Sequence, residues 1–449
     1  MGKAAATVRT TPWELLQPAF TRFLPDSWLE DRPGSRRRIF TLSVTFWAFL
    51  LQVFRPNSSS REVLRQVQAT LLPLGRKISQ ATGGICRAKL RLPVLLLRRI
   101  LQRLGGSPNR VWYGLRPVLV DCTHVRMAAD TPANRRYPQP SGTRPGCSFP
   151  VLKIAALSCL STGRILTFAT HQLHRHDLPL SKRLWRWLKP GDVLVGDRAF
   201  CDYVSIAVQL ARGVHSVFRA HQALKLDLRR AIRLGPSDGL LVLKKPQKRH
   251  PALTPEQWAA LPDRLTVRVL KYRVYEGKPR SREFTLVTTL TDAKAIPAEA
   301  LAELFHRRWD LELCFRNLKT TMGMEEVRGR TPGMVYREVI LFLIAHNLTR
   351  HVMAEAAQTH EVPLLRLSFA GAQAALRQFS PRLLAAGSKK KRMALQEELL
   401  RVIAADKVPE RKGRREPRAV KRRRKPYPML NKPRFQFRDT PHPSRYRKN

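Results

Sequence analysis

Residues 193–198 read Val-Leu-Val-Gly-Asp-Arg and residues 118–121 read Val-Leu-Val-Asp, so a short apolar run leads into a carboxylate twice. Runs of this kind are typical of strands buried on both faces of a sheet. A single aspartate after such a run is more often a turn or cap residue than a ligand. Because the pattern occurs twice, Asp121 and Asp197 are candidates for chemistry at the ends of two strands.

The segments around these runs predict a mixed sheet. Residues 149–160 and 164–170 are strand-like, with a hairpin turn between them. The other expected elements are helices at 177–188 and 200–212 and a strand at 215–218. This β-β-β-α-β-α-β order is expected of an α/β, ribonuclease-H-like mixed sheet core with helices on both faces. In that fold the ends of the first and fourth strands lie side by side, which would bring Asp121 and Asp197 together.

The regions flanking this core have other patterns. Residues 12–106 have helical periodicity, and Ser59 and Glu62 have capping-box spacing. Residues 223–284 alternate like strands, and the chain beyond residue 400 is rich in Pro, Arg and Lys. The predicted organisation is an all-helical N-terminal DNA-binding domain (1–108), a catalytic core (109–222 and 285–350), a β-rich insertion (223–284), a C-terminal helical region (351–404) and a basic, disordered tail (405–449).

Residues 299–322 predict a helix that can supply a third carboxylate. At about 100° per residue, four side chains fall within a sector of roughly 60°: Phe305, Arg308, Glu312 and Lys319. Apolar residues fill the adjoining sector, so the helix packs on the sheet and turns Glu312 toward the sheet edge. Arg308 and Lys319 would flank this carboxylate and suit DNA phosphates, Arg through a forked contact and Lys as a point charge.

Three converging carboxylates suit the chemistry of phosphodiester cleavage and strand transfer. Both reactions need a deprotonated water or 3′ hydroxyl and relief of charge on the phosphate, and two divalent cations roughly 3.5–4 Å apart supply both. Hard cations such as Mg²⁺ take oxygen ligands. We therefore expect two Mg²⁺ ions, with Mn²⁺ able to substitute.

Sequence motifs around these residues carry a family resemblance. The chain reads VLVDCTHV around Asp121, GDRAFCDY around Asp197 and FHRRWDLELCFRNLK from Phe305 to Lys319. It resembles the DDE transposases of bacterial insertion sequences, in the insertion-sequence-4-like group, whose third helix carries a Tyr-x2-Arg-x3-Glu-x6-Lys signature. The spacing matches, with Phe305 in place of Tyr. LPDSWLE, SVTFWAFLLQVF and the KRRRKPYPMLNKPR tail are also similar, so the resemblance spans nearly the whole chain.

The resemblance implies roles for individual residues. The catalytic metal ligands would be Asp121, Asp197 and Glu312, and the DNA-binding residues would be Arg308, Lys319, Trp309, which would stack on a displaced base, and Arg198. Phe305 lacks the hydroxyl that the signature Tyr offers a phosphate. The implied partners are double-stranded DNA, as terminal inverted repeats and target, and a second copy of the chain on paired ends.

Other carboxylates and the cysteines and histidines have structural explanations. Asp310 should point roughly 160° away from Glu312, toward solvent or a salt bridge, and Asp202 should be structural or assist from behind the metal ligands. The six cysteines form no C-x-x-C pair, so we expect buried, reduced thiols. His171, His174 and His176 lack a partner pair at zinc spacing. No phosphate-binding loop of nucleotide hydrolases occurs.

Composition favours a nucleic-acid partner. The 449-residue chain has a formal net charge of +50 and an ordinary apolar content of 43%, and a polyanion would relieve the self-repulsion. Binding to an anionic membrane surface is the alternative, but residues 42–54 are too short to span a bilayer and are expected to form a core helix. The N-terminus lacks the apolar run of a signal peptide, so a cytoplasmic, nucleoid-associated protein is expected.

Two other function classes stay open on the sequence. One is a DNA-binding descendant of a transposase that has lost catalysis, although the intact carboxylate triad argues against it. The other is a metal-dependent, structure-selective nuclease without strand transfer, because the same core serves both reactions. Inverted repeats around the gene, themselves flanked by direct repeats of target sequence, would favour the transposase.

Overall fold

The computed structural model describes the greater part of the chain. The described residues are 16–31, 39–56, 58–71, 78–106, 110–128, 131–140, 146–173, 180, 182–222, 224, 226–250, 253–274, 282–409, 432–433 and 436. His174 and His176 lie outside them, as does most of the basic tail.

A single mixed sheet organises the described residues. Its strands are β1 (Arg116–Met127), β2 (Val151–Cys159), β3 (Ile165–Gln172), β4 (Asp192–Gly196), β5 (His215–Arg219), β6 (Ile232–Gly235), β7 (Asp238–Lys244), β8 (Arg264–Val274), β9 (Arg282–Thr288) and β10 (Glu326–Val327). The order is β3-β2-β1-β4-β5-β9-β8-β7-β6, and β10 pairs with β1. Strands β1, β4 and β5 are parallel, whereas β2 and β3 are antiparallel to their neighbours. The ribonuclease-H-like core is thereby confirmed, with its first and fourth strands adjacent.

Helices cover both faces of this sheet, and each face has its own hydrophobic cluster. The helices are α1 (Gln17–Phe20), α2 (Leu42–Phe54), α3 (Ser60–Leu71), α4 (Gly83–Arg91), α5 (Val94–Gly105), α6 (Pro132–Arg135), α8 (Tyr203–Leu210), α9 (Pro255–Ala259), α10 (Ala298–His306), α11 (Trp309–Arg316), α12 (Pro332–Thr359), α13 (Phe369–Ala385) and α14 (Lys389–Ala405). Helix α8 packs in one cluster, and α5 and α12 pack in the other.

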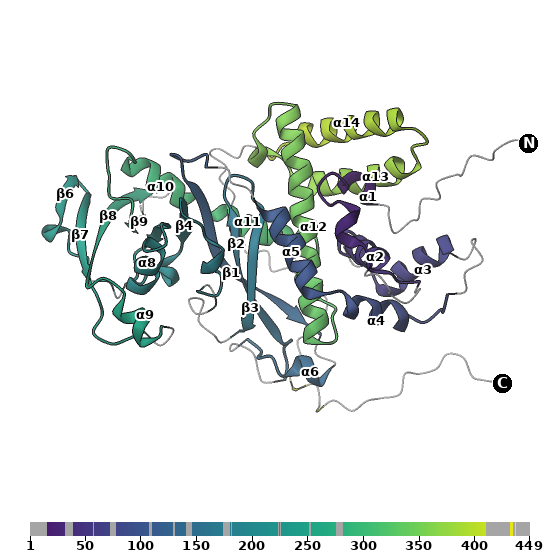
Figure 1. Ribbon diagram of the computed structural model, residues 1–449, viewed down its shortest axis with the longest axis horizontal. Coiled ribbons are helices and arrows are strands. Elements are labelled where there is room, and N and C mark those ends of the chain that lie inside the picture. Colours follow the sequence, from purple (N-terminus) through teal and green to yellow (C-terminus); the bar gives the residue numbers. More distant parts are fainter. Residues whose placement is uncertain are drawn as a thin grey trace, which may run out of the picture.

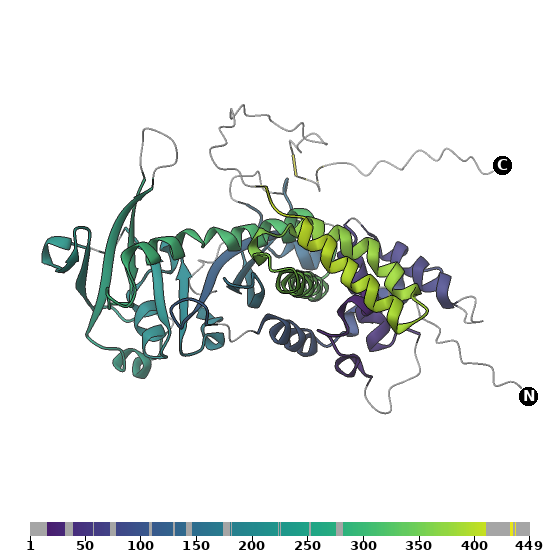
Figure 2. The same cartoon turned by 90° about the horizontal axis from the view of Figure 1, so that it is seen from above.

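Helix α12 joins the sheet to the N-terminal helices. It runs between the strands and the helices α2 to α4 (Figure 1), and α13 and α14 also lie on the side away from the strands (Figures 1 and 2). Its middle, residues 339–345, is buried almost completely because both sides are covered. Arg98 of α5 donates to the Tyr336 hydroxyl (2.8 Å) and Arg337 donates to the Leu92 carbonyl (2.9 Å). The helical N-terminal region is confirmed, and so is the buried core helix at 42–54 within it. The N-terminal helices share one hydrophobic core with the sheet and α12.

The strand-like stretch at 223–284 continues the core sheet. Strand β9 pairs antiparallel with β5, placing Phe218 opposite Val287, and β8, β7 and β6 follow outward. These strands form the end of the molecule farthest from the N-terminal helices (Figure 1). Because β9 crosses the boundary expected at 284, the segment is an extension of one sheet, while the division into domains stays a prediction.

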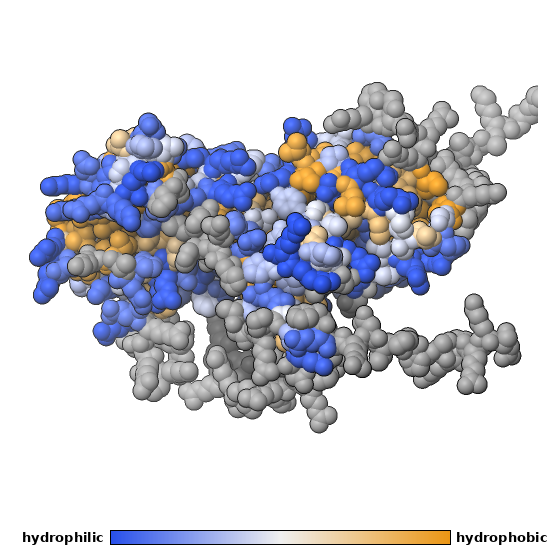
Figure 3. All heavy atoms as spheres, turned by 90° about the horizontal axis from the view of Figure 1, so that it is seen from below, coloured by the Kyte–Doolittle hydropathy of each residue, from blue (hydrophilic) through white to orange (hydrophobic). Residues whose placement is uncertain are grey.

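Hydrophilic side chains cover much of the face seen in Figure 3, interrupted by hydrophobic patches. No helix among the described residues is long and apolar enough to cross a membrane. Three cysteines are only half-buried, contrary to the expectation that all would be buried: Cys86, Cys122 and Cys147. The helix expected at 177–188 falls partly outside the described residues, and its described part ends in the 3-10 turn Trp185–Trp187.

Candidate active site

Asp121 and Asp197 lie side by side at one end of the β1–β4 pair. The parallel register pairs Leu119 with Val195, two residues before each aspartate. Asp197 follows the last residue of β4, as predicted, and its Oδ1 accepts a hydrogen bond from the Arg198 amide (2.7 Å), which caps a 3-10 turn. Asp121, in contrast, lies within β1, which continues to Met127. The expectation that β1 ends at Asp121 is wrong, because residues 122–126 still pair with β2.

Gly196 allows the strands to pack closely beneath Asp197. A Cβ atom there would lie 2.8 Å from Val120 Cγ1 and 2.9 Å from a ring carbon of Phe200. Contacts that short do not occur between carbon atoms in folded proteins. The glycine before Asp197 is therefore required by packing.

The helix expected over 299–322 is broken. Helix α10 ends at His306, α11 begins at Trp309, and residues Asn317–Thr321 form a π-helical turn. Phe305 is 4% exposed and packs in the core, with its ring 6.3 Å from that of Phe284 and its centroid 5.8 Å from the Arg308 guanidinium. The prediction of one regular helix over 299–322 is therefore wrong, although Phe305 still neighbours Arg308, which pairs with Glu312.

Arg308, at the break, connects two of the three carboxylates. Its Nη1 atom lies 3.1 Å from Glu312 Oε1 and 3.6 Å from Asp121 Oδ2. The Arg308 side chain is only 9% exposed, against 22% for Asp121 and 38% for Glu312. The mostly buried Arg308 guanidinium thus holds the Asp121 carboxylate of β1 close to the Glu312 carboxylate of α11.

Burial disfavours the ionised form of the Asp121 carboxyl group. The pKa of Asp121 is raised from 3.8 to about 6, chiefly by desolvation and to a smaller extent by the nearby charges of Glu312 and Asp197. A hydrogen bond from the Cys122 amide (2.8 Å) and the charge of Arg308 act in the opposite direction. The other two predicted carboxylates are therefore close enough to act electrostatically on Asp121.

Comparisons with known proteins identify the family. Residues 112–348, more than half of the chain, match the family model described as transposase DDE domain. The chain belongs to the DDE transposase family. The Escherichia coli (strain K12) transposase InsG for insertion sequence element IS4 is 23% identical over 332 residues, covering 72% of each chain, which supports the insertion-sequence-4-like group. A piggyBac transposase, from the cryo-EM structure of its synaptic complex with hairpin DNA, is similar at a TM-score of 0.45 and 11% identity, covering 92% of this chain and 89% of its own.

DDE transposases cleave and join DNA with divalent metal ions, and the donor chemistry of this transposase fits that use. The predicted ligands, Asp121, Asp197 and Glu312, offer carboxylate oxygens, which hard cations prefer. Among the described residues, no three His, Cys, Asp or Glu side chains stand close enough together to hold an ion as they are placed. Arg308 lies between two of the carboxylates, so the positive charge at this point comes from the protein itself.

The remaining predicted residues surround this centre in the transposase. Trp309 is 57% exposed, with the Arg308 guanidinium 5.2 Å from its ring centroid, and Arg198 is exposed. Lys319 is half-buried in the π-helical turn. Asp310 pairs with Arg307 (3.4 Å), which agrees with the expected salt bridge.

Asp202 and His124 complete the surroundings. Asp202 caps α8, accepting from the Ser205 amide (3.1 Å), so its expected structural role is confirmed. His124 was not predicted; it lies on β1, and partial desolvation of its ring together with the charges of Lys319 and Arg126 lowers its pKa. The sequence signal was its position in VLVDCTHV, three residues after Asp121.

Proposed function

We propose that this transposase cuts DNA at the ends of an insertion sequence and joins the freed 3′ hydroxyl to target DNA. Asp121, Asp197 and Glu312 would hold two Mg²⁺ ions, for which Mn²⁺ could substitute. The observation that carries the proposal is the convergence of two carboxylates on Arg308 beside Asp197, within the segment that matches the DDE domain. When bound, the ions would activate the attacking oxygen and offset charge on the phosphate.

The protein residues would position the DNA around this centre. Arg308 has a planar guanidinium suited to a phosphate, and its buried Nε lacks a hydrogen-bond partner within the described structure. Lys319 would add a point charge on the same side, since its charge reaches His124 on β1. The exposed ring of Trp309 would stack on a displaced base, and Arg198 would contact the backbone next to Asp197.

The assay is strand cleavage and joining of a labelled duplex that carries the presumed element end. We expect nicking and joined products with Mg²⁺ or Mn²⁺, and neither product from Asp197→Asn. Asp202→Asn is the matched control, because it removes a neighbouring carboxylate while asparagine can still cap α8. Cleavage without joining would indicate a nuclease. DNA binding without cleavage under either metal would refute the catalytic proposal.

An insertion sequence has two ends that must both be cut, which favours a dimer of this transposase. We propose a dimer on paired ends, acting at the nucleoid, and the mass of the complex with end DNA tests the dimer. A mass equal to one chain per duplex, with joined products still formed, would contradict it.

A further inference from the structure

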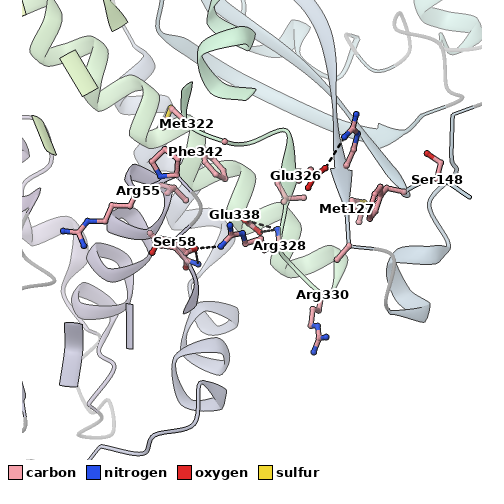
Figure 4. A pocket seen from close by; sticks show the side chains of 18 of the residues that line it. Arg55, Ser58, Met127, Ser148, Met322, Glu326, Arg328, Arg330, Glu338 and Phe342 are labelled. Atoms are coloured by element: carbon pink, nitrogen blue, oxygen red, sulfur yellow. Dashed lines mark hydrogen bonds and ion pairs between the residues drawn. The ribbon is translucent and has the colours of Figure 1, made fainter. Parts of the chain in front are cut away.

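A cavity of about 970 Å³ lies at the end of β1, with Arg126 and Met127 in its wall. Its walls come from the end of α2 and the loop after it, the end of β1, and the segment from β10 to α12. Figure 4 shows Arg55 and Ser58 on one side, Met127 and Ser148 on the other, and Arg328 between them, with Arg328 donating to the Ser58 carbonyl. The cavity therefore joins the N-terminal helices to the catalytic core.

The cavity is cationic. Five arginines line it, against two glutamates: Arg55, Arg126, Arg135, Arg328 and Arg330. Glu338 is buried and already accepts hydrogen bonds from the Arg328 amide (3.0 Å) and the Gly329 amide (2.8 Å), so it holds the wall together. Glu326 pairs with Arg126 (3.1 Å) at the surface, where solvent screens the pair. Two further carboxylates lie beside the lining arginines, Glu62 at 3.9 Å from Arg55 and Glu325 at 3.5 Å from Arg126. Five guanidinium groups therefore face four carboxylates, and a small excess of positive charge remains.

The inner wall of the cavity is apolar. Met127, Met322, Val327 and Phe342 contribute to it. A nucleic-acid backbone alternates anionic phosphates with less polar sugars, so a surface that combines arginines with apolar side chains matches it. Contacts to phosphate oxygens, which arginine side chains can make, fix the register and orientation of a protein on a duplex.

Asp121 and the cavity lie along the same edge of β1. Strand β2 occupies one edge of β1 along residues 118–126, so β4 and β10 share the other edge. On that edge the register with β4 ends at Leu119 and the register with β10 begins at Arg126. Asp121 lies in the interval, 3.6 Å from Arg308, and Arg126, which lines the cavity, lies at the far end of it.

The separation can be converted to base pairs. Arg126 is five residues beyond Asp121, which is about 17 Å along a strand. A DNA strand rises 3.4 Å per nucleotide, so this distance corresponds to about five base pairs. A duplex that reaches from the N-terminal helices to the carboxylates would pass over the cavity.

We propose that this cavity binds backbone phosphates of duplex DNA about five base pairs from the bond that is cut. The proposal rests on the proposed function, since it assumes that Asp121 marks the cleaved phosphate. Each arginine that contacts a phosphate contributes about 0.9 to the slope of log binding constant against log salt concentration.

The test compares two basic cavities. Arg55→Gln with Arg330→Gln changes the walls of this one, and Arg99→Gln with Arg103→Gln changes a second cavity of about 600 Å³. The second cavity includes Arg116 at the start of β1, five residues before Asp121, so it is a control at matched distance in the opposite direction. Binding of the end duplex is measured by fluorescence anisotropy from 50 to 200 mM salt, in the Asp197→Asn background.

We expect the first pair of changes to lower the slope by about 1.8, and the control pair to leave it unchanged. Over this salt range, binding by the parent protein would then fall about 12-fold more than binding by the Arg55 and Arg330 variant. Ethylation of phosphates about five base pairs from the cut should interfere with binding by the parent only. Equal loss in both pairs, or loss in neither, would overturn the proposal. Unchanged thermal unfolding of both variants checks the fold, and cleavage by the wild type reports separately on the proposed function.

Discussion

Replacing Asp121 with asparagine should stabilise the fold at neutral pH while it abolishes cleavage. Asparagine has the shape of aspartate and can still accept the hydrogen bond from the Cys122 amide. It carries no charge, so it removes the cost of holding a carboxylate that is 22% exposed beside Glu312 and Asp197. The loss of attraction to Arg308 is smaller than this relief, because the pKa of Asp121 is raised on balance.

The size of the effect follows from the pKa. A carboxyl group whose pKa rises from 3.8 to about 6 on folding binds more protons in the folded state between these values, so stability falls as pH rises through this window. Above pH 6 the ionised Asp121 carboxylate lowers the free energy of unfolding by about 3 kcal/mol, because each pKa unit corresponds to about 1.36 kcal/mol. For cooperative unfolding of 449 residues, at about 2.1 cal/mol/K per residue, the asparagine variant should melt about 3 °C higher.

Differential scanning calorimetry from pH 4.5 to 8, without divalent ions, measures this difference. The gain should be full at pH 8 and should shrink toward pH 4.5. Asp263→Asn is the control, because the Asp263 side chain is 94% exposed and has little burial to relieve. An unchanged or lower melting temperature at pH 8, or a gain independent of pH, would refute the reasoning. With Mg²⁺ added, the wild type should gain stability and Asp121→Asn should not, if Asp121 is a metal ligand.

Three further variants test neighbouring parts of the structure. Arg308→Gln should bind Mn²⁺ more tightly without DNA, measured by electron paramagnetic resonance, and cleave at least about tenfold more slowly; unchanged Mn²⁺ affinity would contradict the competition for the carboxylates. Gly196→Ala should lower the free energy of unfolding by about 1–3 kcal/mol in urea, since its Cβ would meet Val120 and Phe200; wild-type stability would show that the strands can separate. Glu338→Ala should cost about 1–3 kcal/mol, because two buried backbone amides lose their acceptor; no change would mean that these amides find other acceptors.

The sequence was sufficient to predict the core because its signals are local. The apolar runs before Asp121 and Asp197 are strands buried on both faces, and such strands need apolar residues at every position. Helix α2 was predicted with its observed bounds, since it is too short for a membrane and too apolar for a surface. The roles of Asp121, Asp197 and Glu312 stay predictions, although the fold brings these residues together.

The errors arose where tertiary contacts decide the outcome. Strand β1 continues through the polar residues 122–124 because β2 pairs with it, and no local pattern marks such a continuation. The angular argument for Phe305 and Glu312 assumed one regular helix, but the backbone breaks between them and buries the ring of Phe305. The two-residue strand β10 is too short to leave any periodicity.

The charge balance of the site links Arg308 to both the divalent metal ions and the DNA phosphate that the site would bind. Three ionised carboxylates with one guanidinium leave a net charge of −2, whereas two divalent ions would reverse it to +2, a sign that attracts phosphate. Arg308, 3.1 Å from Glu312, would then stand against two cations at a point that is mostly closed to solvent. The repulsion would be relieved by turning the guanidinium toward an incoming phosphate. Metal binding and DNA binding should therefore favour each other in this chain, because each removes the cost that the other imposes on Arg308.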